Sequence, residues 1–248
     1  MAAALGAFAV LPGLAIGSFL NVVAARLPER RSIVHPGSAC RACATPIAWY
    51  DNVPLVGYLV LRGRCRSCGT SISPIYPAVE LATAALLAGC VVAFGVSLHA
   101  AAAAVFCASL VVVTATDLTH RIVPNRVVLP AAAVVLALMT AADRSPEWAI
   151  AGVGAATFML VVALAYPGGM GMGDVKLALL MGVALGRAVV VAIPLGMLAA
   201  LVPAIVLFAR HGSGARKMAI PFAPFLAVGS VVALFAGDVL IRAYTSLM

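Results

Sequence analysis

Apolar residues fill most of this chain in long stretches that are separated by short polar or glycine-rich breaks. A helix needs about 20 mostly apolar residues to cross the hydrocarbon core of a bilayer. The pattern therefore predicts an all-α polytopic membrane protein with about eight transmembrane helices, the sixth of which is short. The expected spans are residues 4–25, 77–98, 100–116, 126–142, 147–166, 174–187, 188–209 and 222–242.

One substantial hydrophilic segment interrupts this pattern, between the first and second spans. We therefore expect three parts: a first transmembrane helix over residues 1–25, a small cytoplasmic domain over residues 26–76, and a transmembrane core over residues 77–248. Hydrophobic residues make up 64% of the chain and charged residues 10%, with a mean hydropathy of +1.14. This composition excludes an ordinary soluble domain.

The basic residues predict how the spans are oriented. No charge precedes Arg26, so the first apolar segment lacks the basic start of a cleaved signal peptide and should be retained. In the alternating topology, 13 of the 16 basic residues fall on one side, which the positive-inside rule makes cytoplasmic. The exceptions are Arg144, Arg187 and Arg242. We expect the net charge of +8 to reflect this orientation and contact with anionic lipid, with no nucleic-acid partner.

Four cysteines stand as two Cys-x-x-Cys pairs in the hydrophilic segment, Cys40 with Cys43 and Cys65 with Cys68. Two such pairs can place four thiolates tetrahedrally around one Zn²⁺. Since the cytoplasm disfavours disulfides, a structural zinc is preferred over two reducible disulfides or free thiols. A catalytic zinc is not expected, because four cysteines leave no open coordination position.

Two carboxylates stand at the ends of apolar spans, in a chain with only eight Asp and Glu residues. Asp117 closes the third span, and Asp174 opens the sixth after Gly171 and Gly173, with Lys176 following. Ionisable groups at membrane depth cost roughly 2.5–3.5 kcal/mol each, which favours a functional role over a polar helix-end anchor. The glycines would let another backbone approach Asp174. The chain has no Ser/His/Asp arrangement, HExxH motif or phosphate loop, so water activated by an aspartate pair is the favoured chemistry.

Two further features lie beside the cysteine pairs. The aromatic and amphipathic residues 47–61 suggest a domain that lies against the membrane surface. Glu80 opens the second span, where it could cap the helix N-terminus or contact a ligand at the cytoplasmic face.

Taken together, these stretches resemble the bacterial prepilin peptidases, which are the leader peptidases of type IV pilins and type II secretion pseudopilins. The matching motifs, in the family's order, are GSFLNVVAARLP (17–28), CRAC (40–43), WYDNVPLVGYLVLRGRCRSCG (49–69), ISPIYPAVE (72–80), DLTHRIVPN (117–125) and GMGDVKL (171–177). The chain departs from the family at Asn125, where a second acidic residue is common, and at Arg41, where a proline is common.

The resemblance implies an intramembrane aspartic protease of the GxGD type, with Asp117 and Asp174 as the catalytic pair. It would remove a short basic leader from prepilins after a glycine, on the cytoplasmic side of the bacterial inner membrane. Members with the cysteine-bearing segment often also N-methylate the new N-terminal residue with S-adenosylmethionine, and that activity is expected here. The residues that would bind this methyl donor are not identified.

Other functions remain open at this stage. The chain could be a peptidase without methyltransferase activity, or a GxGD protease for an unrelated membrane substrate. It could also be a transporter or channel with a zinc-regulated domain. Transporters usually place acidic residues near the bilayer midplane and often carry an internal repeat. Here both aspartates are expected at cytoplasmic helix ends, and the sequence shows no repeat.

Helix ends also suggest roles within the pair. Asp174 should lie near a helix N-terminus, where the dipole favours a carboxylate, and Asp117 at a helix C-terminus, where it favours the protonated acid. This hypothesis makes Asp174 the base that activates water and Asp117 the initial acid.

Overall fold

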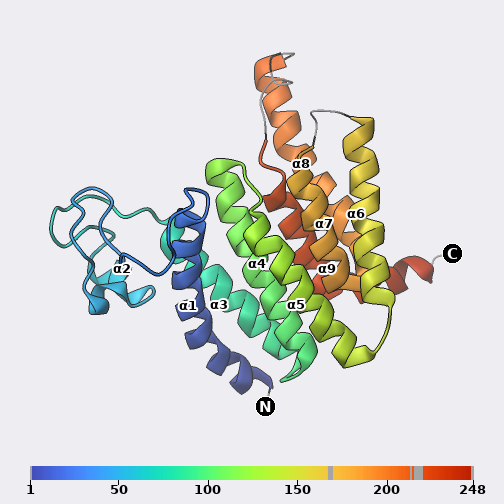
Figure 1. Ribbon diagram of the computed structural model, residues 1–248, viewed down its shortest axis with the longest axis horizontal. Helices are drawn as coiled ribbons and strands as arrows, with labels where there is room; N and C mark the ends of the chain where they lie inside the picture. Colours follow the sequence, from blue (N-terminus) through green and yellow to red (C-terminus); the bar gives the residue numbers. More distant parts are fainter. Residues whose placement is uncertain (1, 167–169, 213, 215–219, 247–248) are drawn as a thin grey trace. The chain divides into compact units, whose positions relative to one another are not determined.

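The structure is a computed structural model that describes residues 2–166, 170–212, 214 and 220–246, and within these ranges it contains helices and no strand. The elements are α1 (Ala2–Arg26), η1 (Trp49–Asn52), α2 (Val56–Val60), α3 (Ile75–Phe94), α4 (Leu98–His120), α5 (Asn125–Asp143), α6 (Glu147–Ala165), α7 (Met172–Leu185), η2 (Gly186–Ala188), α8 (Val189–His211) and α9 (Ala223–Thr245). Figure 1 labels the α-helices and colours the chain from its N-terminus to its C-terminus.

The expected membrane spans are confirmed as helices. Over the described residues, seven segments are long and apolar enough to cross a membrane. One of them, Met172–His211, contains both α7 and α8, so the eight expected spans correspond to α1 and α3 through α9. The short sixth span is α7, whose 14 residues fall below the length that a helix needs to cross a bilayer alone. It ends at Leu185, and the following residue, Gly186, has a φ of +53° that breaks the helix before α8 begins.

Packing divides the chain into two compact units, Met1–Val96 and Ser97–Met248. In the first unit, α1 packs along α3. Small residues make this contact close: a Cβ added to Gly13 would lie 2.7 Å from the Cα of Ala84. A Cβ added to Gly17 would lie 2.7 Å from the Cα of Glu80. Glycine at both positions therefore lets the two backbones approach, as in other membrane helix pairs.

Polar contacts continue this helix pair at the end that carries the hydrophilic segment. The Asn21 side chain donates a hydrogen bond to the Tyr76 carbonyl oxygen at 3.0 Å. Glu80 is buried, and its Oε2 accepts a hydrogen bond from the backbone N–H of Leu55 at 2.8 Å. Glu80 therefore fixes the start of α2 to α3, and its side chain does not cap its own helix.

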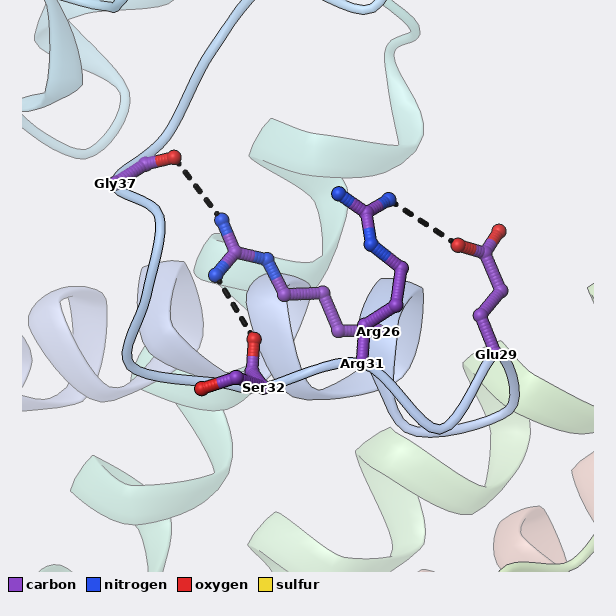
Figure 2. Close-up of polar contacts among 5 residues, drawn as sticks. All are labelled: Arg26, Glu29, Arg31, Ser32 and Gly37. Atoms are coloured by element: carbon purple, nitrogen blue, oxygen red, sulfur yellow. Dashed lines mark hydrogen bonds and ion pairs between the residues drawn. The ribbon is translucent and has the colours of Figure 1, made fainter.

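The chain leaves α1 through a turn that folds back onto the helix end (Figure 2). The Arg26 guanidinium donates to the carbonyl oxygens of Ser32 and Gly37, each at 3.1 Å. An exposed ion pair between Glu29 and Arg31 lies beside it. One arginine side chain thus satisfies two loop carbonyls where α1 ends and the hydrophilic segment begins.

In the second unit, α4 packs on α5 and α9, α5 and α6 pack on α7, and α8 packs on α9. The pair α6–α7 is visible at the centre and right of Figure 1, running side by side. Gly182 of α7 lies so close to α6 that an added Cβ would collide with the Ala151 carbonyl oxygen. The fully buried side chains of this core include Phe106, Leu110, Met159, Leu177, Leu180, Met181 and Leu226.

We predict that Gly182→Ala lowers the free energy of unfolding by about 1–3 kcal/mol, because the new methyl group overpacks a rigid backbone contact. Thermal denaturation in detergent, followed by circular dichroism, measures this. Gly154→Ala in α6 is the matched control, since a Cβ there meets no atom within 4 Å. Equal midpoints for the two variants would contradict the close α6–α7 contact.

Candidate functional site

A pocket of about 560 Å³ lies within the second unit, where the end of α4 meets the start of α7 and the residues before α9. Its lining mixes acidic, basic and apolar side chains. The lining residues are Asp117, Arg121, Ile122, Val123, Asn125, Met170, Gly171, Gly173, Asp174, Lys176, Ile220, Pro221 and Phe222. The five second-unit residues that the sequence selected, both aspartates with Gly171, Gly173 and Lys176, are all among them.

Asp117 lies one turn before the end of α4 and is 7% exposed. Its Oδ2 accepts a hydrogen bond from the backbone N–H of Ala223 at 3.0 Å. Ala223 is the first residue of α9, so Asp117 satisfies one of the unpaired N–H groups with which every helix begins. The carboxylate at the end of one helix therefore caps the start of another.

Asp174 is the third residue of α7 and is 8% exposed. Its Oδ2 accepts a hydrogen bond from the backbone N–H of Gly171 at 3.2 Å, and its own N–H donates to the Gly171 carbonyl oxygen at 3.0 Å. This local arrangement fixes the side chain at the helix N-terminus, where a carboxylate is stabilised. Asp174 and Asp117 line the same pocket.

The loop between α4 and α5 lies against the start of α7. A Cβ added to Gly173 would lie 2.7 Å from the Cβ of Val123, so a side chain of this loop occupies the space that the glycine leaves. Lys176 donates a hydrogen bond to the side-chain oxygen of Asn125 at 3.0 Å. The first contact joins the loop to α7 and the second joins the start of α5 to α7, on either side of Asp174 in the sequence.

A second chemical cluster lies in the first unit. The sulfur atoms of Cys40, Cys43, Cys65 and Cys68 all lie within 4.8 Å of one another. Two of the S···S distances are 3.8 Å and 4.0 Å. A tetrahedral zinc with Zn–S bonds of about 2.3 Å requires S···S distances of about 3.8 Å, so the four thiols fit one zinc ion. The cluster predicted from the spacing is therefore brought together.

The two halves of the cluster have the same local structure. In each, the backbone N–H of the first cysteine donates to a threonine carbonyl five residues later, Cys40 to Thr45 and Cys65 to Thr70. The residue before each threonine has a positive φ, 56° at Ala44 and 71° at Gly69. Both turns come from similar hexapeptides, CRACAT and CRSCGT.

Hydrogen bonds within these turns favour the thiolate form that binds metals at Cys43, Cys65 and Cys68. The pKa of Cys65 is lowered by the backbone N–H groups of Cys68 and Ser67. The pKa of Cys43 is lowered by the hydroxyl and then the backbone of Thr45, and that of Cys68 likewise by Thr70. Thr45 and Thr70 thus favour the thiolates of the cluster. Neither threonine was identified from the sequence, although both stand at the last position of the repeated hexapeptide.

Another contact that sequence reasoning missed stabilises the segment between the cysteine pairs. Arg66 donates from Nε and Nη2 to both oxygens of Asp51, at 2.7 Å and 2.6 Å. The same guanidinium lies 5.5 Å from the centre of the Tyr50 ring. The paired arginine lowers the pKa of Asp51, which keeps the pair charged.

These features define a class: a multi-pass membrane protein that combines a buried carboxylate pair with a separate four-cysteine cluster. Comparison with protein families identifies the class more closely. Residues 11–94 match the bacterial peptidase A24 N-terminal domain, and residues 104–209 match the type IV leader peptidase family.

Curated relatives agree with these matches. A prepilin leader peptidase/N-methyltransferase of Bacillus subtilis is 35% identical over 94% of this chain and 94% of its own length. The Pseudomonas aeruginosa protein of that name is also 35% identical, over 95% of this chain and 91% of its own length. No solved structure matches significantly. The chain belongs to the type IV leader peptidase family and is an enzyme of that family.

We predict that gently purified protein contains about one zinc per chain by elemental analysis, and that Cys65→Ser abolishes this binding. Structural zinc supplies folding energy, so its loss should increase proteolysis within residues 26–76 and leave the membrane helices assembled. The matched control is Cys90→Ala, which removes a thiol outside the cluster. Well under one metal per chain in the unmodified protein would contradict the prediction.

Proposed function

We propose that this protein is an aspartic endopeptidase of the bacterial inner membrane that removes the short basic leader from prepilins or pseudopilins at the cytoplasmic face. The observation that carries this proposal is the pocket that holds Asp117 and Asp174 together, both buried and each bound to a backbone N–H. The names of the curated relatives support prepilins as the substrate class.

The chemistry that we propose is attack by water on the peptide carbonyl after the leader. Two neighbouring carboxylates do not both ionise readily, so the pair holds one proton between them. The ionised aspartate takes a proton from water as its oxygen bonds to the carbonyl carbon. The protonated aspartate gives its proton to the carbonyl oxygen. As the C–N bond breaks, the aspartate that took the proton from water gives it to the amine, and the other aspartate takes a proton back from the intermediate as the new carboxyl group forms.

The helix ends do not distinguish the chemical roles of the two aspartates. Asp174 lies at the N-terminus of α7 as expected, and this supports its role as the base. Asp117, however, also accepts a hydrogen bond from a helix N-terminus, through Ala223. Both carboxylates are therefore stabilised in their ionised form by the same kind of contact, and we propose the pair as a unit.

We further propose that the enzyme methylates the new N-terminal residue, as the names of its relatives suggest. S-adenosylmethionine would supply the methyl group. The cytoplasmic side, where this donor is found, is also the side on which most basic residues are expected.

Incubating the purified full-length protein with a prepilin and measuring the product mass tests both activities. Asp117→Asn and Asp174→Asn should each lower the rate of leader cleavage by roughly 10⁴-fold or more, because groups that act as a unit fail together. Added S-adenosylmethionine should increase the product mass by one methyl group only in enzyme that cleaves.

The control for this experiment is Asp238→Asn, which removes an exposed carboxylate that is paired with Arg187. It should leave cleavage unchanged. Substantial turnover by either pocket variant would exclude the aspartate pair. Cleavage without any mass gain from S-adenosylmethionine would leave a peptidase that lacks methyltransferase activity.

Lys176 is proposed as a positioning residue that holds the start of α5 against α7. Asn125→Leu removes the acceptor of the Lys176 hydrogen bond and should lower kcat by about tenfold with little change in KM, through misplacement of the pair. Asn125→Asp restores an acceptor and should retain most of the activity. A rise in KM at constant kcat in Asn125→Leu would instead indicate that this bond serves substrate binding.

A further inference from the structure

The short helix α2 presents its apolar side outward. Val56, Leu59 and Val60 lie on one face at helical spacing, and Leu59 and Val60 are 71% and 66% exposed. The opposite side faces the protein, where Gly57 is buried against the backbone of Asp51. A soluble domain would instead turn the apolar side of such a helix toward its core.

Neighbouring aromatic residues extend this apolar surface. Trp49 and Tyr50 belong to η1, which packs on α2, and Trp49 is 81% exposed. We name Trp49, Tyr50, Val53, Val56, Leu59 and Val60 the α2 patch. All six are exposed.

The α2 patch carries no unpaired negative charge. Asp51 is the one carboxylate among residues 47–61, and it is held by both nitrogen donors of Arg66. Its side chain is 7% exposed. Over residues 26–76, seven arginines face two carboxylates, so the segment is strongly basic. Arginines of such a segment are attracted to the anionic headgroups of a bilayer.

The structure also ties the residue before α2 to the early part of α3, a helix that is long and apolar enough to cross a membrane. Leu55 directly precedes α2, and its N–H is bound to Glu80, the sixth residue of α3. At 1.5 Å per residue, Glu80 lies about 8 Å along the helix from its start. That distance is comparable to the thickness of the headgroup layer, in which amphipathic helices lie about 5–10 Å deep.

We propose that the α2 patch inserts into the headgroup region of the bilayer and holds the four-cysteine segment flat against an anionic membrane surface. The occupant is the lipid of the leaflet at which α1 ends and α3 begins. Tryptophan and tyrosine are the side chains that membrane proteins enrich at this depth. The early part of α3 is apolar on its surface as well, since Ile75 and Leu81 are also exposed.

The chain offers a direct test, because it contains two tryptophans, Trp49 and Trp148. In full-length protein with Trp148→Phe, Trp49 is the sole tryptophan reporter. The protein is placed one copy per nanodisc, in phosphatidylcholine with or without phosphatidylglycerol. Quenching of Trp49 is measured with phospholipids brominated near the headgroup and, separately, with iodide in water.

The proposal expects brominated lipid to quench most of the Trp49 fluorescence and iodide to quench little of it. Phosphatidylglycerol should strengthen the lipid quenching. Strong iodide quenching with weak lipid quenching would mean that the patch faces water, and it would overturn the proposal. Weak quenching by both reagents would mean that protein covers the patch, and it would overturn the proposal as well.

Charged substitutions test whether the α2 patch is the surface that contacts lipid. Leu59→Glu with Val60→Glu should restore iodide quenching of Trp49 and reduce lipid quenching. Val34→Glu is the matched control, because Val34 is a similarly exposed valine of the same segment that lies outside the patch. An equal effect of Val34→Glu would assign the change to added charge in general and would contradict a specific membrane contact by α2.

Discussion

The hydrogen bond from the Ala223 N–H to Asp117 is the interaction on which the pocket depends. A carboxylate buried among apolar helices must find its donors within the protein, because an unsatisfied buried charge is far too costly to keep. Here the donor is a backbone group that a helix start leaves unpaired, from a residue 106 positions away. One bond therefore satisfies two groups and brings the ends of α4 and α9 together. The hydrogen bond from the Gly171 N–H to Asp174 likewise satisfies a buried carboxylate with a backbone donor, at the start of α7.

Much of this architecture was predictable because the membrane restricts the choices. Spans must be apolar and helical, so the positions of α1 and α3 through α9 followed from hydropathy alone. The cysteine cluster followed from spacing, and Asp117 and Asp174 followed from the rarity of carboxylates beside apolar spans. Each of these signals lies within a short stretch of sequence.

Long-range partners were not predictable in this way. Nothing near Ala223 indicates that its N–H meets Asp117, because the donor is a backbone group that every residue carries. The contact of Gly182 with Ala151 depends on how α6 and α7 cross, which hydropathy does not determine. The domain boundaries at residues 25 and 76 stay a prediction. The outward orientation of the apolar side of α2 was not predictable either, because the sequence does not show that Gly57, rather than Leu59, faces the protein.

The break between Val96 and Ser97 has a consequence for how this enzyme is organised. The aspartates, their backbone donors and the lysine–asparagine contact all belong to residues after the break, and every cysteine of the cluster precedes it. The two family matches, over residues 11–94 and 104–209, respect the same boundary. The aspartate pair and the four-cysteine cluster are thus carried on separately packed halves of one polypeptide. Each cluster is held by hydrogen bonds from residues of its own half, so a substitution in one cluster removes none of the hydrogen bonds described for the other.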